Sequence, residues 1–108
     1  MLEGLYKVEF ETPRKKAVGV VYAHDGKLHG GSSAFTYVGS YTQQGLSVRG
    51  VISSKRHTAD AGLPPVFGVD NVNIEFEGTA KNGLVICEGT AEEAPSLKFK
   101  ALLTRLAD

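Results

Sequence analysis

The stretch DGKLHGGSSAFTYVGSYTQQG, residues 25–45, decides the fold. It opens with Asp25-Gly26, a pair typical of two-residue type I′ hairpin turns, because both central positions of that turn need a positive φ. Aromatic side chains then follow at Phe35, Tyr37 and Tyr41. Residues separated by two or four positions share one face of a β-strand, so this spacing predicts a strand rather than a helix.

The same two-residue period continues on both sides of this stretch. In YKVEFE, residues 6–11, apolar and charged residues alternate, and Pro13 ends the pattern because it has no N–H to donate to a sheet. Asn82-Gly83 repeats the hairpin signal. We expect eight strands near residues 6–11, 17–24, 27–31, 35–41, 46–52, 72–78, 84–90 and 96–106, with a turn at Gln43-Gln44-Gly45.

Eight strands with short connections and no helical pattern indicate an all-β fold. An eight-stranded antiparallel up-and-down barrel closes on itself and so removes its exposed edges. Glu9 and Glu11 on the first strand and Lys98 and Lys100 on the last favour closure through opposite charges. We therefore expect a single β-barrel domain over residues 1–108.

Glycines recur inside the expected strands, at Gly19, Gly39, Gly50, Gly78 and Gly89. Glycine lets a strand kink or lets two backbones approach, so these positions mark the bends of a small barrel. The segments YVGSYTQQGLSVRG and FEGTAKNGLVICEG share this design, since both are hairpins with a glycine on each arm.

The aromatic side chains have two interpretations. Either they fill the barrel end that the glycines create, or they line the mouth of a ligand site. The side chains that we expect inside the barrel are Phe10, Phe35, Tyr37, Phe76 and Phe99.

The composition limits the partners and the compartment. Lys plus Arg equals Asp plus Glu, at 12 each, so the formal net charge is zero and no basic excess points to nucleic acid. Cys87 is the only cysteine, which excludes an internal disulfide. We find neither a signal-peptide pattern nor an apolar run of transmembrane length, and we expect a cytoplasmic protein without membrane contact.

No catalytic motif is evident. The sequence contains no Gly-x-Ser-x-Gly, no phosphate-binding loop and no Cys-x-x-Cys. If Asp25-Gly26 is the turn, His24 lies opposite Lys27 and diagonal to His29, but two imidazoles fall short of the ligands that zinc needs. We therefore expect no enzymatic activity, no cofactor and no metal.

Both faces of the strand at residues 17–24 are apolar. Val18, Val20 and Tyr22 form one of them, and this is the candidate dimer face because one face of a barrel strand points outward. Leu102 and Leu106 raise the same question on the last strand. We expect a homodimer through one of these surfaces. The loop at residues 55–68 is either a plain connection or a cover or contact site at the barrel end.

GLYKVEFET at residues 4–12, GKLHGGSSAFTYVGSY at 26–41 and KRH at 55–57 resemble the GrlR family, bacterial negative regulators associated with type III secretion. The resemblance covers residues 4–105 and implies a lipocalin-like barrel, a dimer and regulation by protein contact without catalysis. In that family the regulator sequesters a transcriptional activator. The family's partner-binding loop, acidic in its best-known member, matches Thr42, Gln43 and Gln44, which carry no charge.

Two functions follow as expectations. The first is a regulatory protein on a GrlR-like scaffold that acts by contact with a protein partner, such as a transcriptional regulator. The alternative is a carrier that holds a small apolar ligand inside the barrel. The carrier function requires an open space inside the barrel, whereas side chains that fill the interior would leave no room for a ligand.

Overall fold

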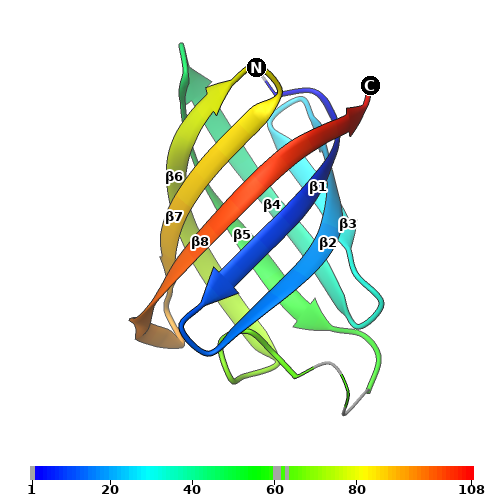
Figure 1. Cartoon of the computed structure of the whole chain (residues 1–108), viewed down its shortest axis with the longest axis vertical. Helices are drawn as coiled ribbons and strands as arrows, with labels where there is room; N and C mark the ends of the chain where they lie inside the picture. Colours follow the sequence, from blue (N-terminus) through cyan, green and yellow to red (C-terminus); the bar gives the residue numbers. More distant parts are fainter. Residues whose placement is uncertain (1, 60–61, 63) are drawn as a thin grey trace.

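The computed structural model describes residues 2–59, 62 and 64–108. Its eight antiparallel strands follow one another in sequence order around a closed barrel, which confirms the expected fold (Figure 1). The strands are β1 (Gly4–Thr12), β2 (Lys15–His24), β3 (Lys27–Gly31), β4 (Phe35–Gln44), β5 (Ser47–Arg56), β6 (Asn71–Lys81), β7 (Leu84–Ala91) and β8 (Ala94–Ala107). The described residues contain no helix that is long and apolar enough to cross a bilayer.

The barrel closes where β1 pairs with β8. Val8 lies opposite Leu103 and Glu11 opposite Lys100, so the first and last strands meet as predicted. The expected charge pairing is only partly in register, because Glu9 lies opposite Leu102 rather than a lysine. The carboxylate of Glu11 makes its ion pair with Lys16 of β2, at 3.7 Å between Oε2 and Nζ. Closure therefore depends on the backbone ladder and the inward side chains more than on charge.

Two of the three predicted turns lie where the sequence places them. Asp25 and Asn82 have φ values of 50° and 52°, and each is followed by a glycine with positive φ, as type I′ turns require. The turn predicted at Gln43-Gln44-Gly45 is right only at Gly45, because β4 continues through Gln44, which pairs with Ser47. Gly45 and Leu46 form the turn, and Leu46, which was expected to begin the next strand, is exposed. A two-residue turn that starts with glycine matches the twist of the strands better than a longer one.

The strand glycines make room for aromatic rings. A Cβ on Gly50 would lie 2.2 Å from the carbonyl oxygen of Ser40 and 2.9 Å from Cζ of Phe76. A Cβ on Gly19 would lie 2.7 Å from Cε2 of Tyr37. As predicted, glycine at these positions lets the backbone lie close to a neighbouring strand and to an aromatic ring inside the barrel.

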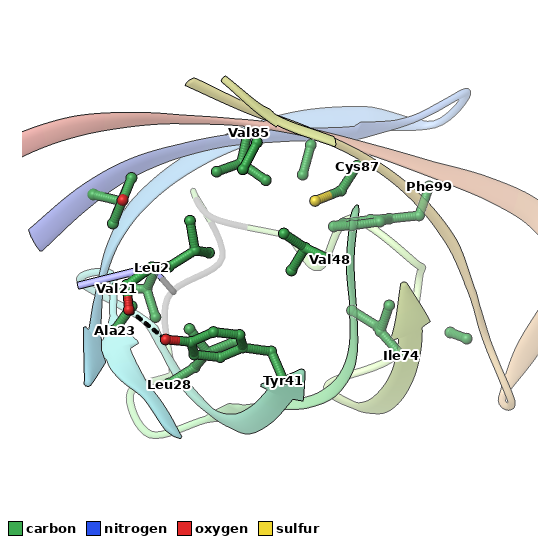
Figure 2. Packing of buried hydrophobic residues seen from close by; sticks show 14 of the residues in the cluster. Leu2, Val21, Ala23, Leu28, Tyr41, Val48, Ile74, Val85, Cys87 and Phe99 are labelled. Carbon is green, nitrogen blue, oxygen red and sulfur yellow. Dashed lines mark hydrogen bonds between the residues drawn. The ribbon is translucent and has the colours of Figure 1, made fainter. Parts of the chain in front are cut away.

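The two ends of the barrel are built differently. The hairpin end holds both termini and the β2–β3, β4–β5 and β6–β7 turns, at the top of Figure 1. There the buried Tyr41 donates a hydrogen bond from its hydroxyl to the carbonyl of Leu2 (Figure 2). The opposite end, the loop end, holds the other connections, including the long one, which runs from residue 57 to residue 70. Residues 60, 61 and 63 of this predicted loop lie outside the described residues.

Candidate functional site

A cavity of about 180 Å³ lies inside the barrel at the loop end. Its wall comes from strands that are far apart in sequence, because inward positions of β1, β2, β4, β5, β6 and β8 converge there. Most of the lining side chains are apolar; those on the inner wall include Phe10, Val21, Tyr37, Ile52, Ile74 and Phe99. Lys15, Ser33 and Pro64 stand where this cavity meets the surface.

The described part of the long loop covers this cavity. Val66 and Phe67 are buried, and the Phe67 ring stacks on Phe99 with 5.7 Å between ring centroids. The Thr12 hydroxyl donates a hydrogen bond of 2.7 Å to the carbonyl oxygen of Val66 and accepts one of 3.2 Å from the N–H of Arg14. One buried threonine thereby fastens the loop to the β1–β2 turn. No local sequence pattern predicts this contact, since Thr12 looks only like the end of a strand.

The predicted interior aromatics separate into three groups. Phe10, Tyr37 and Phe99 meet in the cavity wall: Phe10 lies edge-on to Tyr37 at 5.4 Å and 6.1 Å from Phe99, measured between ring centroids. Phe35 lines the rim of the same cavity, and the Arg56 guanidinium sits 4.5 Å from its ring centroid. Phe76 faces inward nearer the hairpin end and lines a second cavity.

Polar groups occupy one side of the loop-end cavity. Tyr37, Ser32 and Ser54 contribute hydroxyls to its lining. Burial raises the pKa of the Tyr37 hydroxyl, and a hydrogen bond with Ser32 opposes this in part. The phenol therefore stays protonated, and it can donate a hydrogen bond to a guest molecule or accept one from it.

The second cavity is smaller, at about 60 Å³, and lies toward the hairpin end. It shares Val8, Val21, Ile52 and Phe99 with the first, so these four side chains separate the two spaces. Cys87 lies in its wall, and burial raises the pKa of this thiol to about 11. Figure 2 shows Cys87 among aliphatic neighbours beside Phe99. A thiol in such surroundings packs as a small apolar group.

The outer surface of β2 is as apolar as its inner surface. Val18, Val20 and Tyr22 point outward and are 58%, 41% and 43% exposed, whereas Val21 and Ala23 are buried. On β8, Leu106 is also exposed and Leu102 is half-buried. The structure adds Val38 on β4 and Val51 on β5, both exposed. Sequence reasoning missed these two because each stands alone among polar neighbours on its own strand.

The residues matched to the family's partner-binding loop do not share one face. Thr42 and Gln44 are exposed at the end of β4, while Gln43 lies on the inward side between them. The Gln43 amide donates a hydrogen bond of 2.9 Å from Nε2 to the carbonyl oxygen of Gly45. Its Oε1 is buried and has no hydrogen-bond partner among the residues that the structure describes. Two of the three predicted contact residues are thus available to a partner.

Two of the three histidines, His24 and His29, lie where the hairpin register placed them. His24 faces Lys27, and Tyr22 faces His29, as predicted. Glu3 ties this hairpin down: its carboxylate lies 2.9 Å from Nδ1 of His24 and accepts a 2.9 Å hydrogen bond from the N–H of Asp25. Within the described ranges, no group of three or more His, Cys, Asp or Glu side chains is arranged to hold a metal ion.

Comparison with known proteins gives no family for the chain. No family model matches the sequence, and no curated protein matches it. The closed eight-stranded barrel implied by the resemblance to GrlR is present, and no family match confirms the resemblance itself.

Proposed function

We propose that this barrel is a non-enzymatic binding protein whose loop-end cavity holds a small, mainly apolar ligand. The observation that carries the proposal is the space itself: about 180 Å³ remains between the aromatic wall and Phe67. Apolar cavities of about 150 Å³ accept a molecule the size of benzene. A ligand with one aromatic ring, or an aliphatic chain of similar volume, fits this space.

The lining also favours one polar group on the ligand. Binding pockets combine apolar walls with a few polar groups that fix orientation. Tyr37, Ser32 and Ser54 provide such groups on one side, so a hydroxyl or carbonyl of the ligand would face them. The apolar part of the wall, including Val21, Ile74 and Phe99, would hold the ring.

A titration with benzyl alcohol, followed by amide NMR shifts of the labelled protein, tests this proposal. We expect saturable shifts at cavity-lining residues, and we expect Ala17→Leu, which fills the cavity, to weaken binding about tenfold or more. Val20→Leu enlarges an outward side chain of the same strand that does not line the cavity, and it serves as the matched control. Shifts that never saturate, or equal loss in both variants, would contradict a ligand site in this cavity.

A second candidate is the regulatory role by protein contact that the resemblance to GrlR implies. One observation favours it: Val18, Val20 and Tyr22 form an exposed apolar row on a small protein, and such patches mark interaction sites. The partner would be another protein, such as a transcriptional regulator, or a second copy of the chain. Light scattering separates these cases, because a mass of one 11.5 kDa chain at micromolar concentration would exclude the homodimer.

A further inference from the structure

Four neighbouring strands of the barrel carry no acidic residue. Strands β2, β3, β4 and β5, every residue of which the structure describes, contain six Lys or Arg and no Asp or Glu. The whole chain has a formal net charge of zero, so everything outside these strands carries six excess negative charges. Although the chain is neutral as a whole, its positive charges are concentrated on β2–β5, and these four strands are neighbours in the barrel.

The outward side chains of these strands form one continuous surface, which we call the basic face. Across its middle, Tyr22 lies opposite His29, and His29 lies opposite Val38. Val51 is diagonal to Val38 on the next strand, since it pairs with Ser40. Strand neighbours at these spacings are within side-chain reach, so Tyr22, His29, Val38 and Val51 form one row, which we call the apolar band although the His29 imidazole lies within it.

Cations frame this apolar band. Lys16 and Lys55 lie toward the loop end, and Lys27 and Arg49 toward the hairpin end. Lys16 and Arg49 reach acids on the adjoining strands, with N···O distances of 3.7 Å to Glu11 and 3.5 Å to Glu77, and both pairs are largely exposed. Lys27 and Lys55 have no ion pair with any residue that the structure describes.

We infer that the basic face binds another protein whose own surface has an apolar centre and an acidic rim. Charge complementarity of this kind speeds encounter and selects partners. The inference rests on the protein-contact candidate above and adds the site and the chemistry of the partner.

A second copy of the chain fits this face less well. Face-to-face contact of two copies would set the four cations of one against those of the other, which is unfavourable. The opposite side of the barrel is of mixed charge, because Glu77 is paired with Arg49 and Glu88 lies opposite Lys100. A different protein is therefore the better occupant.

Other anionic surfaces match poorly as well. Valines on a sheet are short and lie close to the backbone, so they cannot enter a bilayer to the depth of about 5–10 Å that membrane-surface helices reach. Nucleic acid needs cations spaced along its phosphates, whereas here the apolar band separates the lysines.

The test uses a peptide of alternating Glu and Val or Tyr residues as probe, with a peptide of the same pattern bearing Lys in place of Glu as control. We expect amide shifts confined to β2–β5, no binding of the lysine peptide, and loss of affinity when sodium chloride rises from about 0.05 M to about 0.5 M. Lys27→Glu with Lys55→Glu should weaken binding about tenfold or more. Lys81→Glu with Lys98→Glu makes the same change in net charge elsewhere and should leave affinity unchanged.

Each other outcome overturns the inference in a recognisable way. Shifts centred on Leu84, Ile86 and Leu102 would keep a protein-contact role but move it to β7 and β8. Equal weakening in both double variants would reduce the effect to net charge. Tighter binding to single-stranded DNA or to phosphatidylglycerol vesicles than to the acidic peptide would assign the basic face to another class of partner. The benzyl alcohol titration is independent of all these results and reports on the cavity alone.

Discussion

The two ends of this barrel are closed in different ways. At the hairpin end, two-residue turns hold neighbouring strands close, Tyr41 is bonded to the Leu2 carbonyl, and the space that remains is about 60 Å³. At the loop end, a cover from outside the sheet is fastened by Thr12, and about 180 Å³ remains. Two-residue turns also join β1 to β2 and β7 to β8 at the loop end, so the two ends differ in the long connection between β5 and β6, beneath which the larger space lies. Function is expected where closure depends on a loop.

Replacing one aromatic side chain at each end gives the largest contrast. Tyr41→Ala should lower the free energy of unfolding by about 4 kcal/mol, because it leaves a hole between strands that cannot collapse and an unpaired Leu2 carbonyl. Phe67→Ala should cost only about 2 kcal/mol, since a loop can settle into the vacated space. Urea unfolding measures both. Equal losses would mean that the two ends are equally rigid.

Thiol chemistry probes access to the two interiors. With its pKa raised to about 11, Cys87 should react with a disulfide reagent at pH 8 about 200-fold more slowly than a thiol of ordinary pKa, and burial slows it further. Ser54→Cys in a Cys87→Ala background places the thiol in the loop-end cavity and should react much faster. Similar rates for the two thiols would show that both interiors admit the reagent equally.

The fastening of the loop can be tested at one hydroxyl. Thr12→Val removes the donor to the Val66 carbonyl while keeping the shape of the side chain, and it should cost about 2 kcal/mol of unfolding free energy. Thr12→Ser keeps a hydroxyl and should recover most of the loss. If Val and Ser behave alike, the hydrogen bond does not hold the loop.

The smallest effects concern one carboxylate at each end. A hydrogen bond from the Asp25 N–H lowers the pKa of Glu3, and one from the Asn73 N–H lowers the pKa of Glu93. A carboxylate with a lowered folded-state pKa stabilises the protein above its unfolded pKa of about 4.3, and this contribution is lost as pH falls through the folded value.

Glu3→Gln and Glu93→Gln should therefore melt slightly below the wild type at neutral pH and together with it near the acid limit. Thermal unfolding followed across this range measures the difference. Glu92→Gln alters the adjacent side chain of the same turn and is the control. If a variant still melts below the wild type at low pH, the shape of the side chain and not its charge accounts for the effect.

The fold was predictable because its signals are local. Alternation in residues 6–11 and the Asp25-Gly26 and Asn82-Gly83 turns each depend on a few neighbouring residues, and eight such segments leave little choice but closure. The turn after β4 was misplaced because Leu46 looks like a strand residue, although the backbone of a two-residue turn needs only Gly45 to be special.

The site was less predictable because its parts meet only through the topology. The bond from Thr12 to Val66 joins residues 54 positions apart, and no short-range pattern announces it. The absence of acids from β2–β5 is visible in the sequence, but it acquires meaning only when these strands become neighbours. Phe76 was assigned to the right side of its strand, yet its height along the barrel decides which cavity it lines.

The seam between β1 and β8 also has a consequence for how the chain matures in the cell. Until β8 has left the ribosome, the backbone N–H and C=O groups of β1 that pair with β8 have no partner. The backbone groups on the β8-facing edge of β7 are unpaired as well. Hairpins between neighbouring strands can form early, but the barrel closes only when its last strand, β8, pairs with its first strand, β1. A stalled or truncated product lacking β8 would expose the unpaired edges of β1 and β7, and it would be prone to aggregate through them.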